Sequence, residues 1–353
     1  MLFDPLKLRE ITLRNRIIVS PMCQYSSQDG FANDWHFVHL ASRAVGGAGL
    51  VFTEAAAVTP EGRISSEDLG IWKDEHVAEL SRIVRFIDAQ GAVAGMQLAH
   101  SGRKGSTQQP WVGNKQIRVD EGGFRPIYAP SALAFKPGDE APEALSEAGI
   151  ARIVRSFGEA AERALRAGFR VLELHAAHGY LLHSFLSPLA NHRQDQYGGS
   201  FDNRIRALLE TVRAVRGKWP ARLPLFVRIS ATDWAEGGWD ADQSVELARR
   251  LGQEGVDLVD CSSGGLVPSA KVPVGPGYQT QFAERIRREA KIMTGAVGLI
   301  RSPEQAEHIL RSGQADAVIL ARQMLRDPYW PLTAARALGV QAQLPVQYDR
   351  ARD

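Results

Sequence analysis

The segment Val171–Tyr180 reads V-L-E-L-H-A-A-H-G-Y and has the form of a short buried strand that ends in polar residues. Side chains alternate along a strand, so Leu172 and Leu174 share one apolar face. Glu173 and His175 share the opposite face with the first valine of the segment. Polar groups on that second face indicate that it borders something other than a purely apolar core.

His175, His178 and Tyr180 lie at the end of this strand or just past it. Two imidazoles can donate hydrogen bonds to one substrate oxygen, and a phenol beside them can deliver a proton. Two other interpretations stay open for a His-x-x-His pattern considered alone: a zinc site, or two histidines that are satisfied within the core. The three residues are therefore candidate catalytic and substrate-binding groups.

Short β-branched or apolar runs alternate along the chain with longer helical patterns, which is typical of repeated βα units and a parallel sheet. The expected strands are Ile17–Pro21, Leu50–Thr53, Val93–Leu98, Val171–Leu174, Leu225–Ser230, Leu258–Cys261, Ile292–Ala296 and Ala317–Leu320. The expected helices are Trp35–Val45, His76–Ala89, Glu147–Arg166, Asn203–Arg216, Asp242–Gln253, Gln281–Glu289, Pro303–Leu310 and Tyr329–Ala337. Eight such units predict a (β/α)8 TIM barrel, one α/β domain over residues 1–353.

A doubly wound sheet is the competing architecture. It normally carries a glycine-rich phosphate loop in its first βα turn. Here that turn reads S-P-M-C-Q-Y over residues 20–25 and contains no glycine. The barrel is therefore favoured.

The composition favours a globular protein that acts on small molecules. The 353 residues are 44% hydrophobic, which suffices for a large core. The net charge of +2 comes from 42 basic and 40 acidic residues that are interspersed, so no nucleic-acid-binding block emerges. No apolar run suggests a membrane span or a secretory signal. Cys23 and Cys261 are too few for a disulfide scaffold, and we expect a cytoplasmic protein with no membrane partner.

Two segments fall outside the repeated units. Residues 101–146, between the third strand and its helix, are rich in Gly, Pro and Gln. Loops of that length in compact domains are usually lids or binding elements, so we expect a lid over the top of the barrel that includes Trp111. Residues 344–353 form a polar tail, which alone would be read as a frayed terminus.

An arginine is expected inside the barrel. The run Leu225–Ser230 reads L-F-V-R-I-S, and its alternation turns Arg228 inward. An inward arginine is costly unless it is paired, and the expected partner is an internal carboxylate such as Glu173 or Glu54.

Further polar and glycine positions suggest a phosphorylated, planar ligand. Gln97 points inward on the third strand, and small residues below it, such as Gly95, suggest space for a flat group. The seventh strand runs into T-G-A-V-G at residues 294–298, where glycine lets backbone N–H groups approach an anion. Arg322 follows the eighth strand, and phosphate commonly sits beside these two loops in TIM barrels.

The chain resembles the Old Yellow Enzyme family of flavin-dependent ene-reductases, and in particular its thermophilic-like or xenobiotic reductase branch. The resemblance covers nearly the whole chain. It rests on L-R-N-R-I-I-V-S-P-M-C-Q-Y (Leu13–Tyr25), E-A-A-A-V-T-P-E-G-R (Glu54–Arg63), Q-L-A-H-S-G-R-K (Gln97–Lys104), H-A-A-H-G-Y (His175–Tyr180), L-S-P-L-A-N-H-R-Q-D-Q-Y-G-G-S (Leu186–Ser200) and L-F-V-R-I-S (Leu225–Ser230).

The resemblance implies tightly bound, non-covalent FMN and NADPH as the reductant. The cofactor-binding residues that it implies are Ser20, Pro21, Met22, Cys23, Ala55, Gln97, Arg228, Gly298, Ala321 and Arg322. Gly298 and Arg322 would hold the phosphate, and Cys23 would contact the flavin and modulate its reduction potential. Ala321 departs from relatives that often carry glycine before the arginine, and its methyl group needs slightly more room.

The resemblance also implies a substrate site. His175 and His178 would bind the oxygen of the activating group, Tyr25 would line the substrate face and Tyr180 would donate a proton. Arg350 matches a C-terminal arginine that, in this branch, reaches the active site of a neighbouring subunit. A homodimer or homotetramer is therefore expected.

The expected reaction is a two-stage, ping-pong reduction of the activated C=C bond of an α,β-unsaturated carbonyl or a related electron-poor xenobiotic. Two alternatives differ in class. A metal-dependent barrel hydrolase would use His175, His178 and a carboxylate, but it would need further ligands on other strands. A flavin-binding protein that senses or stores would not need the intact histidine pair with Tyr180.

Overall fold

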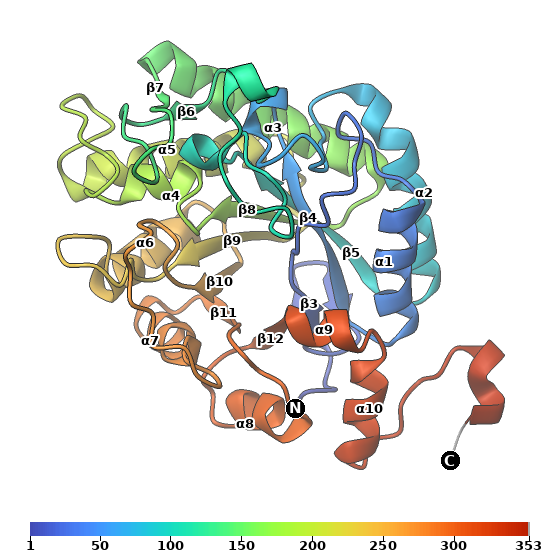
Figure 1. Cartoon of the computed structure of the whole chain (residues 1–353). Helices are drawn as coiled ribbons and strands as arrows, with labels where there is room; N and C mark the ends of the chain where they lie inside the picture. The colour runs from blue at the N-terminus through green and yellow to red at the C-terminus, as the bar shows by residue number, and fades with distance from the viewer. Residues whose placement is uncertain (352–353) are drawn as a thin grey trace.

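The computed structural model describes residues 1–351, in which eight parallel strands close into a barrel (Figure 1). In order around the barrel these are β3 (Ile17–Val19), β4 (Leu50–Ala57), β5 (Val93–Ala99), β8 (Val171–Ala176), β9 (Leu225–Ser230), β10 (Leu258–Ser262), β11 (Met293–Ala296) and β12 (Ala317–Leu320). All eight expected strands are confirmed, and the closed sheet confirms the TIM barrel over the doubly wound alternative. Most bounds coincide with the expected ones and the others differ by one or two residues, except that β4 continues four residues further.

The eight expected helices are also present, and they surround the barrel (Figure 1). They are α1 (Asp34–Val45), α2 (Val77–Ala89), α3 (Glu147–Ala167), α5 (Phe201–Arg216), α6 (Ala241–Gln253), α7 (Thr280–Ala290), α8 (Pro303–Arg311) and α10 (Trp330–Ala337). Two short helices were not predicted: α4 (Leu181–Leu186), after β8, and α9 (Arg322–Arg326), after β12. Within residues 1–351, no helix combines the length and the apolar character that a membrane crossing requires.

Local sequence explains where these helices begin and end. The Ser146 side chain accepts a hydrogen bond from the Gly149 N–H and caps α3. The same helix ends at Gly168, whose φ of +97° suits glycine. Ser302 caps α8 in the same way, and Pro303 occupies its first turn. These caps fix where α3 and α8 begin, and so they set the end of the loop that precedes each of these two helices.

An N-terminal hairpin, which was not predicted, covers the end of the barrel at which the strands begin. It consists of β1 (Leu6–Leu8) and β2 (Ile11–Leu13), paired antiparallel. Between them, Arg9 donates hydrogen bonds to the carbonyl oxygens of Ala221 and Gly255, at 2.6 and 3.0 Å. Both acceptors precede strands β9 and β10, so the hairpin lies opposite the strands' carboxyl ends.

Aromatic side chains fill the lower interior of the barrel. The rings of Phe52 and Phe226 meet edge to face, with centroids 5.9 Å apart. Phe52 occupies the space beside Gly95, because a Cβ at Gly95 would lie 2.7 Å from the Phe52 ring. The space expected below Gln97 is therefore filled by protein, and a flat ligand has to lie above Gln97. This corrects the sequence-based interpretation of Gly95.

Residues 101–146 form one long excursion between β5 and α3. It contains the 3-10 turns η3 (Gly102–Lys104) and η4 (Val119–Glu121) and the small strands β6 (Tyr128–Ala129) and β7 (Glu143–Ala144). The Trp111 side chain is 70% exposed, and its ring meets the ring of Tyr25 edge to face at 5.6 Å. The excursion thus reaches the loop after β3, while its role as a lid stays a prediction.

The C-terminal tail extends away from the barrel (Figure 1). It ends in the 3-10 segment η5 (Val346–Ala351), and Arg352 and Asp353 lie outside the described residues. The hydroxyl groups of Tyr348 and Tyr329 lie 3.2 Å apart, which joins the tail to the region of α10. Arg350 is exposed, and it belongs to this 3-10 segment of the tail.

Candidate active site

Polar side chains from neighbouring strands meet inside the upper part of the barrel. Gln97 on β5 lies opposite Glu173 on β8, and Arg228 on β9 lies opposite both His175 and Asp260 on its two neighbouring strands. All five are buried. The predicted inward direction of Gln97, Glu173, His175 and Arg228 is confirmed, and it follows from the alternation of side chains in parallel strands.

Arg228 is paired with Asp260, which the sequence analysis did not identify. Its Nε lies 3.1 Å from the Asp260 Oδ2 atom, and its Nη1 donates to the Ser20 Oγ atom at 3.1 Å. The expected partner Glu54 instead faces the His36 Nε2 atom at 3.1 Å, outside this cluster. The reason is the barrel register, because Asp260 stands directly beside Arg228 on the adjacent strand.

The two carboxyl groups near Arg228 differ in their pKa values. Burial, followed by the neighbouring Asp260, raises the pKa of Glu173 to about 8. Burial also raises the pKa of Asp260 to about 6, against the opposing effect of Arg228. At neutral pH Asp260 is therefore the carboxylate that balances the guanidinium charge, while Glu173 is protonated. Glu173 also accepts a hydrogen bond from the Gln97 Nε2 atom at 2.7 Å.

The two histidines present ring nitrogens to one point. The backbone N–H of Ala177 donates to the His175 Nδ1 atom at 3.2 Å, so the proton of neutral His175 belongs on Nε2. That Nε2 lies 3.4 Å from the His178 Nδ1 atom. The other nitrogen of His178 lies 2.7 Å from the Ser262 Oγ atom. Burial, followed by the positive charge of Arg228, lowers the pKa of both imidazoles well below the usual value.

A phenol completes this corner of the site. The Tyr180 ring meets the His175 ring edge to face at 4.9 Å. Burial raises the pKa of Tyr180 well above its usual value, so the hydroxyl keeps its proton at neutral pH. His178 itself has a φ of +58°, a left-handed conformation that is uncommon for a residue other than glycine. Such conformations concentrate at functional sites because the surrounding structure enforces them.

The loop after β3 supplies the predicted residues on the opposite side. Tyr25 also has a positive φ, +48°, and burial raises the pKa of its hydroxyl well above the usual value. Burial, followed by the Asp68 carboxyl group, raises the pKa of Cys23 well above its usual value, so the thiol is uncharged. Ala55, on β4, stands opposite Gln97 in the register of β4 and β5.

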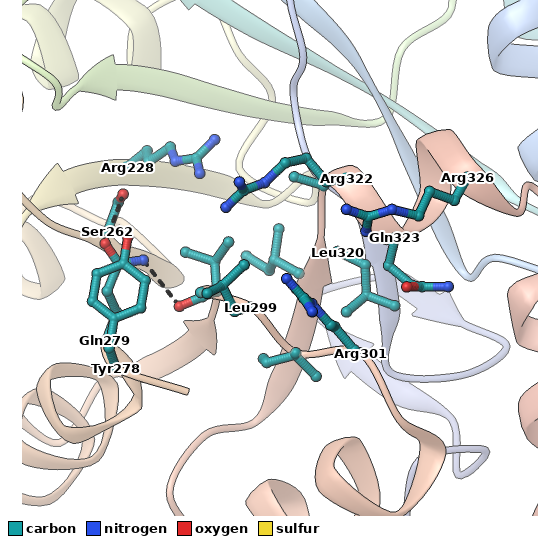
Figure 2. Close-up of a pocket in the computed structure, with 15 residues that line it drawn as sticks. Arg228, Ser262, Tyr278, Gln279, Leu299, Arg301, Leu320, Arg322, Gln323 and Arg326 are labelled. Atoms are coloured by element: carbon teal, nitrogen blue, oxygen red, sulfur yellow. Dashed lines mark hydrogen bonds between the residues drawn. The ribbon is translucent and has the colours of Figure 1, made fainter. Parts of the chain in front are cut away.

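A cavity of about 140 Å³ adjoins these residues at the ends of β11 and β12 (Figure 2). Arg228 and Arg322 point into it from opposite sides, and Arg301 and Arg326 also line it (Figure 2). Among the described residues, none that lines it is Asp or Glu. Arg228 is paired with Asp260, whereas the other three guanidinium groups have no carboxylate beside them in the lining, which indicates a site for a strongly anionic group such as phosphate.

The backbone beside this cavity accounts for its shape. Gly298 has a φ of +128°, which side-chain-bearing residues rarely adopt, and a Cβ there would lie 3.1 Å from the Gln279 Nε2 atom. Ala321 lines the same cavity with a φ of −99°, which lies outside the left-handed region that favours glycine. The departure from glycine at Ala321 therefore introduces no conformational strain in φ.

This donor set fits FMN. The arginine-lined cavity suits the phosphate, while Gln97 and Arg228 offer hydrogen-bond donors deeper in the mouth. The metal-centred alternative lacks its ligands, because no cluster of three or more His, Cys, Asp or Glu side chains within residues 1–351 is arranged to hold an ion. The zinc interpretation of His175 and His178 is accordingly not supported.

Three residues near the site, Asp260, Ser262 and Lys104, were not predicted as site residues from the sequence. Asp260 and Ser262 alternate along the run Leu258–Ser262, a signal that the sequence analysis did not use. Lys104, within a motif quoted for the resemblance, contacts the His178 backbone. Arg350 lies in η5 of the C-terminal tail, and its contact with a neighbouring subunit stays a prediction.

Comparison with known proteins agrees with this geometry. The chain is 49% identical over 352 residues to an NADPH dehydrogenase of Geobacillus thermodenitrificans, covering 99% of this chain and 98% of the relative. A solved structure of morphinone reductase in complex with tetrahydroNAD has a TM-score of 0.78 and 30% identity, covering 98% of this chain and 92% of that one. An Old Yellow Enzyme homologue from Zymomonas mobilis has a TM-score of 0.79 and 25% identity, covering 98% and 94%.

The model of the NADH:flavin oxidoreductase / NADH oxidase family matches residues 1–341. The match confirms the predicted class of enzyme, an NAD(P)H-dependent flavin oxidoreductase with FMN as its cofactor. It also agrees with the resemblance found in the sequence motifs. The chain belongs to the NADH:flavin oxidoreductase / NADH oxidase family, the family of the Old Yellow Enzymes.

Proposed function

We propose that this protein reduces the activated C=C bond of α,β-unsaturated carbonyls and related electron-poor xenobiotics, with NADPH as the reductant, in a ping-pong sequence. The observation that carries the proposal is the pair of ring nitrogens, His175 Nε2 and His178 Nδ1, that lie 3.4 Å apart beside Tyr180. A carbonyl oxygen placed at that point can accept a hydrogen bond from each ring. The name of the 49% identical relative, NADPH dehydrogenase, supports the choice of reductant.

The residues proposed to hold FMN are those that the family resemblance implies, and the geometry of the mouth supports several of them. Arg322 and the Gly298 backbone would bind the phosphate, and Gln97 and Arg228 would bind the polar edge of the ring. The whole set is Ser20, Pro21, Met22, Cys23, Ala55, Gln97, Arg228, Gly298, Ala321 and Arg322. When bound, FMN supplies the hydride chemistry of the reaction.

The histidine pair would act mainly on developing negative charge. Both imidazoles are neutral, so they stabilise the carbonyl oxygen as hydrogen-bond donors. Hydrogen bonds to that oxygen strengthen as enolate charge builds, which favours the transition state over the bound substrate. Tyr180 would then transfer its proton to the α-carbon, and Tyr25 would line the opposite side of the substrate.

The proposal also covers the C-terminal tail, the excursion formed by residues 101–146 and the location of the protein in the cell. We infer a cytoplasmic homodimer or homotetramer in which Arg350 of one subunit reaches the active site of its neighbour. The exposure of Arg350, on a C-terminal tail that extends away from the barrel, supports this arrangement. Residues 101–146 would form the lid, a role supported by the contact of Trp111 with Tyr25.

The experiment begins with the colour of the purified protein. We expect a yellow protein that bleaches with NADPH under anaerobic conditions and recolours when 2-cyclohexenone is added. The double variant His175→Ala/His178→Ala should keep FMN, yet bind 4-hydroxybenzaldehyde weakly and reduce the enone slowly. A colourless protein that ignores added FMN would refute the proposal. Unchanged phenol titration in the double variant would refute the role of the pair, and failure to turn over NADPH with an enone would favour sensing or storage.

A further inference from the structure

Lys104 joins the loops that follow three strands of the barrel. It ends η3, just after β5, and its Nζ donates to the carbonyl oxygen of His178 at 2.7 Å and to that of Gly265 at 2.7 Å. His178 follows β8, and Gly265 follows β10. One side chain therefore links three segments that are distant in sequence, directly beneath the second member of the histidine pair.

The backbone at this point has little freedom of its own. His178 has a φ of +58°, and the turn that it begins packs against Gly265 without space for another atom. A Cβ at Gly265 would lie 2.7 Å from the His178 Cα, and a Cβ at Gly179 would lie 2.3 Å from the Gly265 carbonyl oxygen. Because both carbonyl oxygens approach the same point, they need a shared donor there.

The surroundings of the Lys104 amine show that it is not held by an ion pair. Within residues 1–351 no carboxylate forms a salt bridge with it, and its nitrogen lies 4.2 Å from the ring centroid of Phe135 and 5.5 Å from that of Tyr180. Burial, followed by the charges of Arg103 and Lys136, lowers the pKa of Lys104 to about 7. The neutral amine still has two N–H groups for the two carbonyls, so the link persists in either protonation state.

We propose that Lys104 is a positioning residue, whose two hydrogen bonds hold His178 in its left-handed conformation and so aim the His178 ring at the oxygen-binding point. The inference rests on the proposed function, because that function assigns the point to a substrate oxygen. Lys104 acts through His178 and does not itself touch the substrate. Removal of the amine leaves two converging carbonyls unsatisfied, and the turn should relax.

The test is a double-mutant cycle on the FMN-loaded protein, with 4-hydroxybenzaldehyde as the probe. Lys104→Met should weaken its binding about tenfold and leave flavin content unchanged. In a His178→Ala background the same change should have less than about a twofold effect, because residues that act as one unit are not additive. The control is Lys218→Met, which removes an exposed lysine that pairs with Glu162 on the surface and should leave binding unchanged.

Equal weakening in both backgrounds, or no weakening at all, would overturn the proposal. A crystal structure of Lys104→Met provides a readout that does not depend on the probe. We expect His178 to leave the left-handed region, and an unmoved His178 would refute the positioning role even if the protein reduces no enone. If Lys104→Met fails to fold, Lys104→Gln takes its place in the same cycle and the same structural comparison. Loss of phenol binding in the wild type would count against the proposed function alone.

Discussion

Gln97 donates a hydrogen bond from Nε2 to the Oε1 atom of Glu173, 2.7 Å away, between two neighbouring strands in the barrel interior. Glu173 is fully buried, and its pKa is raised to about 8 by burial and then by Asp260. The pair therefore consists of an amide and a protonated carboxyl group at neutral pH. Ionisation of Glu173 would place a second negative charge beside Asp260.

Glu173→Gln should change how stability depends on pH. The folded pKa lies above the usual 4.5, so between pH 4.5 and 8 the folded state binds more protons than the unfolded state. Stability of the wild type is consequently lost as pH rises through this window. Relative to wild type, the glutamine variant should gain on the order of 4 kcal/mol between pH 5 and 8.5. Urea unfolding of the apoprotein at both pH values measures this difference.

The control for that measurement is Glu159→Gln, an exposed position on α3. Its unfolding free energy should stay within about 0.5 kcal/mol of wild type at both pH values. A Glu173→Gln variant whose difference from wild type is the same at pH 5 and 8.5 would contradict the raised pKa.

Ser262→Ala should disturb the second histidine, and because Ser262 also lines the cavity of Figure 2, the FMN content of the variant is measured first. The serine hydroxyl lies 2.7 Å from the His178 Nε2 atom, and this contact favours the tautomer with its proton on Nδ1 when the hydroxyl donates. We expect 4-hydroxybenzaldehyde to bind about five- to tenfold more weakly, as the loss of one hydrogen bond predicts. Flavin absorbance titration gives the Kd. The neighbouring Ser263→Ala should change it less than about twofold, and an equal loss in both variants would point to a general effect on the loop.

Tyr180→Phe should separate proton transfer from binding. The ring stays against His175, but the hydroxyl that would protonate the α-carbon is lost. Rapid-mixing measurements should show that 2-cyclohexenone reduction is slowed by about 10² or more, while reduction of the flavin by NADPH is nearly unchanged. If enone reduction keeps the wild-type rate, the proton must come from another group.

Arg322→Met tests the assignment of the cavity in Figure 2 to the phosphate. The apoprotein should lose about tenfold or more in affinity for FMN, because a charge-assisted hydrogen bond to phosphate is removed. Its affinity for riboflavin, which has no phosphate, should be unchanged. Arg311→Met, on the surface of α8, removes an exposed charge and should affect neither ligand. Equal losses for FMN and riboflavin would place the phosphate elsewhere.

Strand alternation was enough to predict several parts of the site. It placed Gln97, Glu173 and Arg228 inside the barrel, because their spacing relative to apolar neighbours is local information. It could not identify Asp260 as the partner of Arg228, since that depends on which residues of two strands stand side by side. The same limit applies to Lys104, whose partners come from the loops after two other strands.

Local signals also misjudged a few elements. The run Leu50–Ala57 continues as a strand through Glu54, because that carboxylate is buried against His36 rather than exposed at a strand end. The helix Arg322–Arg326 is only five residues long, too short to give a periodic pattern. Gly95 suggested open space, whereas the Phe52 ring, from a neighbouring strand, fills it.

The rings of Phe52 and Phe226 fill the lower interior of the barrel, and the N-terminal hairpin covers that end. A ligand of the barrel interior therefore enters from the end at which the carboxyl ends of the strands lie. A ligand that enters from this end also has to leave from this end. In the proposed ping-pong sequence, NADPH and the electron-poor substrate would have to use this same opening, so each would block the binding of the other. An excess of either compound should therefore slow turnover. This competition would follow from the closed lower end of the barrel and not from any residue at the reacting atoms.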